Sequence, residues 1–315
     1  YNGQHYSIDS LKSIFGESDA GLFGYIDSAS VSDVTLKYVD ISGDYQTGGI
    51  AGYAMNNSFI SGCGVTGSVS GSNNVAGICG YLHESEVNAS FSAASVQGST
   101  SGYAFGGIAG FVDYTSVISD SYSRSPVSGG SYTGGLAGSV NRNSAVTDCY
   151  SAGSVSGSGY TGGLIGHSSE SFITGCFWDI EKSNQTVSSG GTAKTTLEMQ
   201  TGSTYTSAGW DFLNVWKIDG IENAGYPYFL WQTFYIDTPS VSIFCDQAVD
   251  QYPIIMLDWN TVPDAVQYKI YSSIDPDAEF PADWVLEAAT TRPGCSFVLS
   301  DPESTKKFYV VVAEN

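Results

Sequence analysis

The stretch Gly106-Gly107-Ile108-Ala109-Gly110 occurs, with small changes, at five other places in the chain. The six copies begin at residues 20, 48, 76, 106, 134 and 162, so consecutive copies are 28 or 30 residues apart. A second segment recurs in the same units, since Ser144-Ala145-Val146-Thr147-Asp148-Cys149 matches Ser171-Phe172-Ile173-Thr174-Gly175-Cys176. Apolar and polar residues alternate over short segments between glycines, which is typical of β-strands. A unit of this size cannot bury its own apolar face, so the repeat predicts units that stack.

We therefore predict an all-β chain whose residues 1–180 form a right-handed parallel β-solenoid, with one repeat of about 28 residues in each coil. Residues 181–235 are predicted to be a solenoid-capping aromatic segment. They contain Trp210, Trp216 and Trp231, and linkers are poor in tryptophan. Alternating segments in residues 236–315 predict a separate β-sandwich.

The repeat resembles a known family. Its Gly-Gly-[Ile/Leu]-x-Gly core, followed by a segment such as Ala145–Gly157, is similar to the GLUG repeat of large bacterial surface and adhesin-like proteins. Gly209-Trp210-Asp211-Phe212 and Gly225-Tyr226-Pro227-Tyr228 resemble the segment that closes such arrays, so the resemblance covers about residues 1–232. Trp259, Tyr268, Tyr271 and the run Tyr309-x-Val311-x-Ala313 resemble an immunoglobulin-like, fibronectin type III-like sandwich. The resemblance implies an extracellular or cell-surface bacterial protein.

Composition excludes several partners. The formal net charge is −21 with only 11 Lys and Arg, whereas nucleic-acid binding needs a basic surface. The sequence has no run of 18 apolar residues, so we expect no membrane insertion. The chain opens with Tyr1 rather than Met, and we expect a mature, processed or fragmentary chain.

Both ends of the chain are predicted to present strand edges. The segment Tyr1–Ile8 resembles a coil from within a solenoid, and the chain stops soon after the strand-like run Phe308–Ala313. Three explanations stay open: a longer parent chain, coverage by local loops, or copies of the protein that add strands head to tail. The last predicts a structural protein, a subunit of a surface fibre, filament or adhesin stalk. The predicted assembly residues are Tyr1, Ile8, Phe308, Tyr309, Val310, Val311, Val312 and Ala313.

A second hypothesis is an adhesin that binds a glycan or a protein through the solenoid face. Tyrosines precede four of the Gly-Gly motifs by two or three residues, and an exposed row of them would stack on sugar rings or on a partner. The alternative is that the rings only stabilise the turns. These tyrosines are Tyr45, Tyr103, Tyr132 and Tyr160.

We expect no enzyme, no catalytic residues, no cofactor and no metal ion. His5, His83 and His167 lie in different units without a shared spacing, and the acidic loop 275–279 lacks the ligand spacing of a calcium site. A carbohydrate-active enzyme, the third hypothesis, needs carboxylates clustered with basic residues. The basic residues predicted in the solenoid do not recur in register: Lys12, Lys37, Arg124 and Arg142.

Cysteines and glycosylation motifs complete the predictions. Cys63, Cys149 and Cys176 share one repeat position and are predicted to be buried thiols, with a Cys149–Cys176 disulfide as the alternative. Cys245 and Cys295 could bridge strands of the C-terminal domain. Surface glycosylation is a further hypothesis, at Asn56, Asn88, Asn184, Ser10 and Ser28.

Overall fold

The computed structural model describes residues 1–4, 6–14, 18–232, 241–249, 252–259, 267–273, 285–290, 295–298 and 308–314. The chain divides into two compact units, Tyr1–Leu230 and Trp231–Asn315. The aromatic segment expected over residues 181–235 therefore belongs to the first unit almost entirely. No helix among the described residues is long and apolar enough to cross a membrane.

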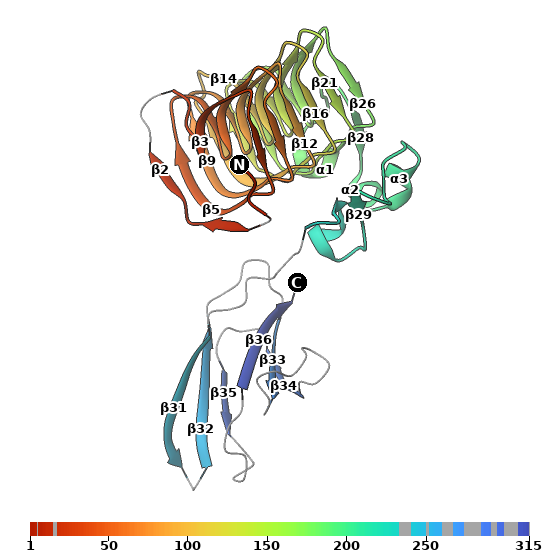
Figure 1. The fold of residues 1–315 in the computed structure, drawn as a ribbon. Coiled ribbons are helices and arrows are strands. Elements are labelled where there is room, and N and C mark those ends of the chain that lie inside the picture. The colour runs from red at the N-terminus through yellow and green to blue at the C-terminus, as the bar shows by residue number, and fades with distance from the viewer. Residues whose placement is uncertain are drawn as a thin grey trace. The chain divides into compact units, whose positions relative to one another are not determined.

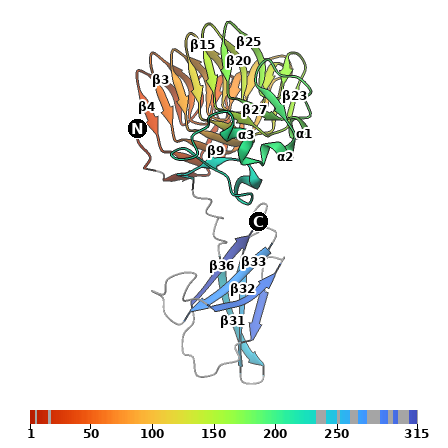
Figure 2. The same cartoon turned by 90° about the vertical axis from the view of Figure 1, so that its right-hand side faces the viewer.

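The first unit is a parallel β-solenoid, as the repeat predicts (Figures 1 and 2). Each coil contributes strands to four parallel sheets, which we call sheets I to IV in the order in which the chain meets them after Phe23. Sheet I contains β3 (Phe23–Asp27), β7 (Ala51–Met55), β11 (Cys79–His83), β15 (Ala109–Asp113), β20 (Ala137–Asn141) and β25 (Ile165–Ser169). Sheet II contains β4 (Ser30–Ser32), β8 (Phe59–Ser61), β12 (Glu86–Asn88), β16 (Val117–Ser119), β21 (Ala145–Thr147) and β26 (Phe172–Thr174).

The other two sheets complete each coil. Sheet III contains β1 (Ser7–Asp9), β2 (Lys12–Ile14), β5 (Thr35–Ser42), β9 (Gly64–Gly71), β13 (Phe91–Gly98), β17 (Tyr122–Ser123), β18 (Val127–Gly129), β22 (Tyr150–Ser151), β23 (Val155–Gly157), β27 (Phe177–Asp179) and β28 (Thr192–Lys194). Sheet IV contains β6 (Tyr45–Gly48), β10 (Asn73–Ala76), β14 (Tyr103–Gly106), β19 (Ser131–Gly134) and β24 (Thr161–Gly162). The register places equivalent residues of successive repeats above one another, such as Val69 beside Val96 and Val96 beside Val127.

The Gly-Gly motif lets one coil pack closely on the next. A methyl group on Gly107 would lie 1.8 Å from Ser123 Oγ and 2.5 Å from the carbonyl oxygen of Gly135. The equivalent Gly77 and Gly135 face Ser92 and Ser151 in the same way, at 1.9 and 2.1 Å. The second glycine of the motif is therefore required because an inward serine and the backbone of the next coil fill the space of a side chain.

Inward serines and cysteines connect the coils through hydrogen bonds. The backbone N–H of Cys63 donates to Ser90 Oγ at 3.1 Å, that of Ser90 donates to Ser121 Oγ at 3.2 Å, and that of Ser121 donates to Cys149 Sγ at 3.4 Å. Cys176 continues this row, and the thiols of Cys63, Cys79, Cys149 and Cys176 are free and buried. The prediction of buried thiols is confirmed, and the Cys149–Cys176 disulfide is not formed.

The C-terminal end of the solenoid is covered by an extra partial coil. The N–H of Gly163 donates to the carbonyl of Val187 at 3.0 Å, and β28 pairs with β27. The short helix α1 (Ile180–Ser183) precedes this partial coil, with the Asp179 carboxylate accepting the N–H groups of Glu181 and Lys182 at its start. Residues 187–194 therefore pair with the last coil of the solenoid.

The aromatic residues that follow lie on the side of the solenoid instead of over its last coil. Residues 196–230, the flank segment, contain α2 (Thr196–Met199), α3 (Gly202–Thr206), β29 (Trp216–Lys217), the 3-10 turn η1 (Glu222–Gly225) and β30 (Tyr228–Phe229). Its rings pack on a stacked row on the outer face of sheet III, where the centroids of Phe91 and Tyr122 lie 5.4 Å apart and those of Tyr122 and Tyr150 lie 5.0 Å apart. The ring centroid of Trp216 lies 6.2 Å from that of each of these two tyrosines. The segment lies on the flank because this outward row is apolar and needs cover.

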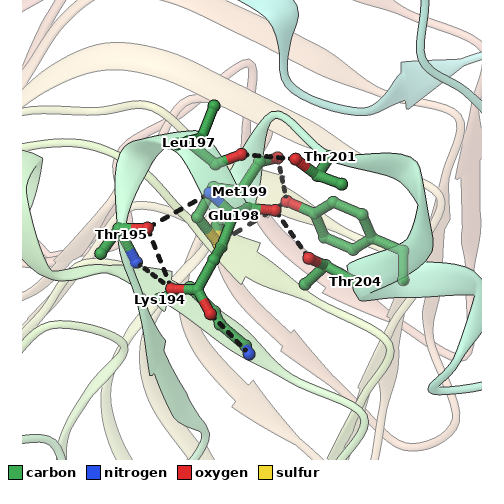
Figure 3. A network of polar contacts seen from close by, with 8 residues as sticks. Lys194, Thr195, Leu197, Glu198, Met199, Thr201 and Thr204 are labelled. Atoms are coloured by element: carbon green, nitrogen blue, oxygen red, sulfur yellow. Dashed lines mark hydrogen bonds and ion pairs between the residues drawn. The ribbon is translucent and has the colours of Figure 1, made fainter.

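Hydrogen bonds fix the start of the flank segment (Figure 3). Thr195 and Glu198 form a capping box at α2, in which Glu198 Oε2 accepts the Thr195 N–H at 2.9 Å and Thr195 Oγ1 accepts the Glu198 N–H at 3.3 Å. Lys194 pairs with the Glu198 carboxylate at 3.2 Å. Bonds from Thr195 and Lys194 hold the pKa of Glu198 below its usual value.

The described residues of the second unit form two antiparallel sheets of three strands each. One has the order β31 (Val241–Val249), β32 (Tyr252–Trp259) and β35 (Cys295–Val298), and the other has the order β34 (Val285–Thr290), β33 (Gln267–Ser273) and β36 (Phe308–Glu314). The predicted strand Phe308–Ala313 thus lies in β36. The side chains of its residues, the thiols of Cys245 and Cys295, His5 and the acidic loop 275–279 lie outside the described part of the chain.

Candidate functional site on the outer face of the solenoid

A row of outward aromatic side chains runs along sheet I. Tyr25, Tyr53, Tyr81 and Phe111 occupy equivalent positions on four successive strands. Their ring centroids lie 5.4, 4.8 and 5.3 Å apart, with Tyr53 and Tyr81 stacked in parallel. Because parallel strands repeat about every 4.8 Å, the in-register repeat alone produces this stack.

The row ends where a small residue replaces the next ring. Ser139 lies beside Phe111, and His167 lies beside Ser139 on the last strand of sheet I. A hollow of about 350 Å³ lies over this break. The rings of Phe111, Tyr132 and His167 line it together with the polar side chains of Asn141, Arg142, Asp113 and Glu170. Its volume lies within the range of about 300–1,000 Å³ that is usual for small-molecule sites.

The polar side of the hollow is held rigidly. Asp113 is only 2% exposed, and its Oδ2 atom accepts hydrogen bonds from Arg142 Nη1 at 3.0 Å and from the Tyr81 hydroxyl at 3.3 Å. The Arg142 guanidinium also lies over the Tyr114 ring, 4.4 Å from its centroid. Burial, and then the charge of Asp113, raise the pKa of Tyr81, so its hydroxyl stays a donor. The guanidinium is therefore fixed from two sides while its side chain remains 55% exposed.

The turn that presents Arg142 has a left-handed backbone. Arg142 and its neighbour Asn143 have φ values of +50° and +62°. Equivalent turns between sheets I and II also use left-handed residues, among them Asn56, Asn57 and Glu84. Asparagine adopts this conformation readily, whereas arginine does so rarely. A long cationic side chain is thus placed at the rim of the hollow by a turn whose backbone favours other residues.

The four tyrosines predicted as a ligand ladder fall into two groups. Tyr45 and Tyr103 align on sheet IV with Asn73 between them, and Asn73 Oδ1 accepts the Tyr103 N–H at 3.1 Å. Tyr132 and Tyr160 occupy the next position along the strands, with ring centroids 5.5 Å apart. The structure does not bring all four together. Tyr132, whose ring lies 4.8 Å from that of His167, lines the hollow.

The predicted assembly residues of the N-terminal end lie in an incomplete coil. The N–H of Gly3 donates to the carbonyl of Ser32 at 2.7 Å, and the N–H of Ser32 donates to the carbonyl of Tyr1 at 2.8 Å, so residues 1–3 cover part of β4. Ile8 lies in β1, paired with Leu36 of β5. The Tyr1 side chain is 64% exposed. Among the described residues, β1, β2 and β3 are the N-terminal edge strands of sheets III and I.

Three of the four predicted bases of the solenoid have separate roles. Lys12 pairs with Asp40 at 2.9 Å, and Arg124 donates to Asn223 Oδ1 of the flank segment at 2.9 Å. Arg142 alone lies at the hollow. Within the part of the chain that the structure describes, no three His, Cys, Asp or Glu side chains form a group that could hold a metal ion.

The sequence predictions missed the aromatic row of sheet I. Its residues directly follow the last glycine of each Gly-Gly motif, so a periodic signal was present in the sequence. Comparison of the chain with protein-family models, with curated proteins and with solved structures finds no match.

Proposed function

We propose that the chain is an extracellular, cell-surface structural protein of the GLUG-repeat kind, a subunit of a fibre or an adhesin stalk. It assembles head to tail, with copies of itself or with the rest of a longer parent chain. The right hand of the solenoid and the fibronectin-like identity of the second unit are parts of the same proposal. The observation that carries it is that strand edges lie at both ends of the chain, in β1 to β3 and in β36.

These edges favour assembly for a physical reason. The outer edge of a sheet presents backbone N–H and C=O groups that another strand can pair with. In the described residues, β1 and β2 pair with β5 on one side, and β36 pairs with β33 on one side. Strand addition at such an edge is a recurrent mode of protein association. We assign the acceptor edge to the coil around Tyr1–Ile8 and the donor to Phe308–Ala313.

Local coverage acts at the other places where coils end. Residues 1–3 pair with β4, and residues 187–194 cover the last coil. This coverage protects parts of the solenoid from unspecific association, since exposed edges promote aggregation. Among the residues that the structure describes, it leaves the edges of β1, β2 and β3 for a specific contact.

Electron microscopy of the purified chain at neutral pH tests the proposal. We expect filaments with an axial repeat near the length of one subunit. A chain that lacks residues 308–314 should remain monomeric, because the donor strand is gone. Leu213→Lys is the matched control, since Leu213 is 83% exposed on the flank segment and far from these strands in sequence. Dispersed monomers of the intact chain, or filaments of the truncated one, would contradict assembly through these edges.

A second candidate function, binding of a glycan or protein through the solenoid face, is favoured by the hollow at Ser139. Binding and assembly can coexist in an adhesin stalk because the hollow lies on sheet I and away from β1 and β2. A carbohydrate-active enzyme stays the third hypothesis, and a glycan-cleavage assay tests it.

Glycosylation accompanies the extracellular proposal. Ser10 and Ser28 lie in turns with φ values of +59° and +51°, and both are exposed. Asn56 lies in a left-handed turn, whereas Asn88 lies within β12 and its amide donates to Ser119 Oγ at 2.9 Å. We therefore expect modification at Ser10, Ser28, Asn56 and Asn184 rather than at Asn88. An intact mass equal to the 33.3 kDa of the bare chain would contradict it.

A further inference from the structure

We propose that the hollow at Ser139 binds one neutral hexopyranose residue of a polysaccharide, between Phe111 on one side and the contacting rings of Tyr132 and His167 on the other. The inference names a ligand class for the second candidate function and does not depend on assembly.

The walls of the hollow suit a sugar ring. A pyranose has faces of C–H groups and an equator of hydroxyl groups, so its site needs an aromatic surface beside planar hydrogen-bonding groups. The ring centroids of Tyr132 and His167 lie 4.8 Å apart, so these two rings contact each other and form one wall. Phe111 lies two strands from His167, across Ser139, and forms the other wall. His167 Nδ1 lies 3.4 Å from Ser139 Oγ, which orients the imidazole. The break in the aromatic row thus leaves a space between rings rather than a continuous stack.

The polar groups suit hydroxyls. Arg142 and Asn141 can donate hydrogen bonds into the hollow, while the exposed Glu170 carboxylate can accept them. Arg142 keeps its geometry because Asp113 and Tyr114 hold the guanidinium from two sides. Asn141 Nδ2 donates to Ser139 Oγ at 2.9 Å, so its carbonyl oxygen is also placed. A rigid site loses little conformational entropy when a ligand binds.

Charge selects a neutral ligand. The one cation at the hollow, Arg142, is already paired with Asp113, and Glu170 adds a second carboxylate. The chain as a whole carries a formal charge of −21, which repels anionic polymers at long range. Uronic acids, sulfated sugars and phosphates therefore fit this site less well than a neutral hexose.

The aromatic row makes a polymer the natural ligand. Tyr81, Tyr53 and Tyr25 continue from Phe111 along sheet I, away from the hollow. Tyr25 is 48% exposed, and Tyr53 and Tyr81 are partly exposed. A chain with one residue in the hollow can therefore extend along further aromatic surface.

Affinity electrophoresis in native gels that contain mannan, dextran or galactomannan tests the inference, with alginate as the anionic comparison. We expect retardation of the intact chain in at least one neutral gel and none in alginate. Tyr132→Ala should weaken the interaction about tenfold or more through loss of one stacking ring. Alanine suits this backbone, because Ala104 occupies the equivalent position one coil earlier with φ +66°.

Two further variants complete the design. His167→Ala removes the other ring of the same wall and should weaken binding similarly, so the test stands even if Tyr132→Ala fails to fold. Tyr103→Ala is the matched control: Tyr103 is 42% exposed on sheet IV but does not line the hollow, and its loss should leave retardation unchanged. Free migration in all three neutral gels overturns the inference. So does full retardation of both Tyr132→Ala and His167→Ala, retardation by alginate alone, or an equal loss in Tyr103→Ala.

Discussion

Replacing Gly107 by alanine tests the packing of one coil on the next. The added methyl group would lie 1.8 Å from Ser123 Oγ, and no real Cβ atom lies that close to another heavy atom. Ser123 is completely buried, and its Oγ accepts the Ser125 N–H at 3.2 Å. The serine can turn away only by giving up that bond. The Gly135 carbonyl, 2.5 Å from the new methyl, can move only if the whole next coil moves.

The expected cost follows from these contacts. Overpacking a tight interior costs about 1–3 kcal/mol, and loss of the hydrogen bond adds about 1 kcal/mol, so Gly107→Ala should destabilise the first unit by about 2–4 kcal/mol. Adding Ser123→Gly removes both the Oγ and the Cβ contact of the serine. The double variant should recover part of the loss and retain the part caused by the Gly135 carbonyl.

Urea unfolding followed by tryptophan fluorescence measures the effect. A loss of this size lowers the unfolding midpoint by about 1 M urea. Gly202→Ala is the matched control. Gly202 is the first residue of α3, and the nearest atom to its added methyl, Ile218 Cγ2, lies 3.4 Å away, so alanine should be neutral or stabilise by up to about 1 kcal/mol. An unchanged midpoint for Gly107→Ala, or no recovery in the double variant, would refute the proposed role of the second glycine.

Three further predictions concern the first unit. Burial raises the pKa of Cys63 to about 11 and that of Cys79 to about 12. We therefore expect neither thiol to react with iodoacetamide at pH 8 until the chain is denatured. Labelling of native samples, detected by peptide mass spectrometry, would contradict this. Trp216→Ala removes a fully buried ring and should lower stability by about 3–5 kcal/mol, so proteolysis within residues 196–230 should become faster. Cleavage as slow as in the intact chain would argue against the flank contact. Bonds from Thr195 lower the pKa of Glu198, and bonds from Asn214 lower that of Asp211. A carboxyl group whose pKa is lowered in the folded state contributes stability at pH values above its unfolded-state pKa, and this stability is lost as the pH falls through its folded-state pKa. The flank segment should therefore loosen below about pH 4. Unchanged tryptophan fluorescence down to pH 2 would be the contrary result.

The coils could be predicted from the sequence because the residues that repeat in each coil have strict steric roles. The second glycine of each motif and the inward Ile or Leu after it follow from packing alone, and both occur in every complete coil. The position of the flank segment could not be predicted, because Tyr122 and Tyr150 look like ordinary strand residues in the sequence. Only the register of sheet III brings these rings into one apolar row that Trp216 then covers.

The candidate site was predicted only in part. Tyr132 is one of the tyrosines that the sequence predicts as a ligand ladder, but its partner His167 lies 35 residues further along the chain, counted from their numbers, and no repeat position links the two. The hollow depends on the small Ser139 lying between Phe111 and His167. It also depends on the left-handed backbone of Arg142, which directs the guanidinium to the rim. Such arrangements combine three coils, and a repeat pattern within one coil does not contain them.

The flank segment also determines how the molecule resists tension. Trp216 Nε1 donates to Asp120, the Tyr150 hydroxyl donates to the Pro227 carbonyl, and Trp210 Nε1 donates to the Gly175 carbonyl, so one short stretch is fastened to three successive coils. In a stacked array each coil otherwise contacts only its neighbours, and unravelling proceeds one coil at a time. A pull on the N-terminus therefore extends the early coils at low force and stops at the braced coils, where several units must yield together. In the proposed stalk under shear, the early coils would extend first and take up the load, and the braced coils would stay in place.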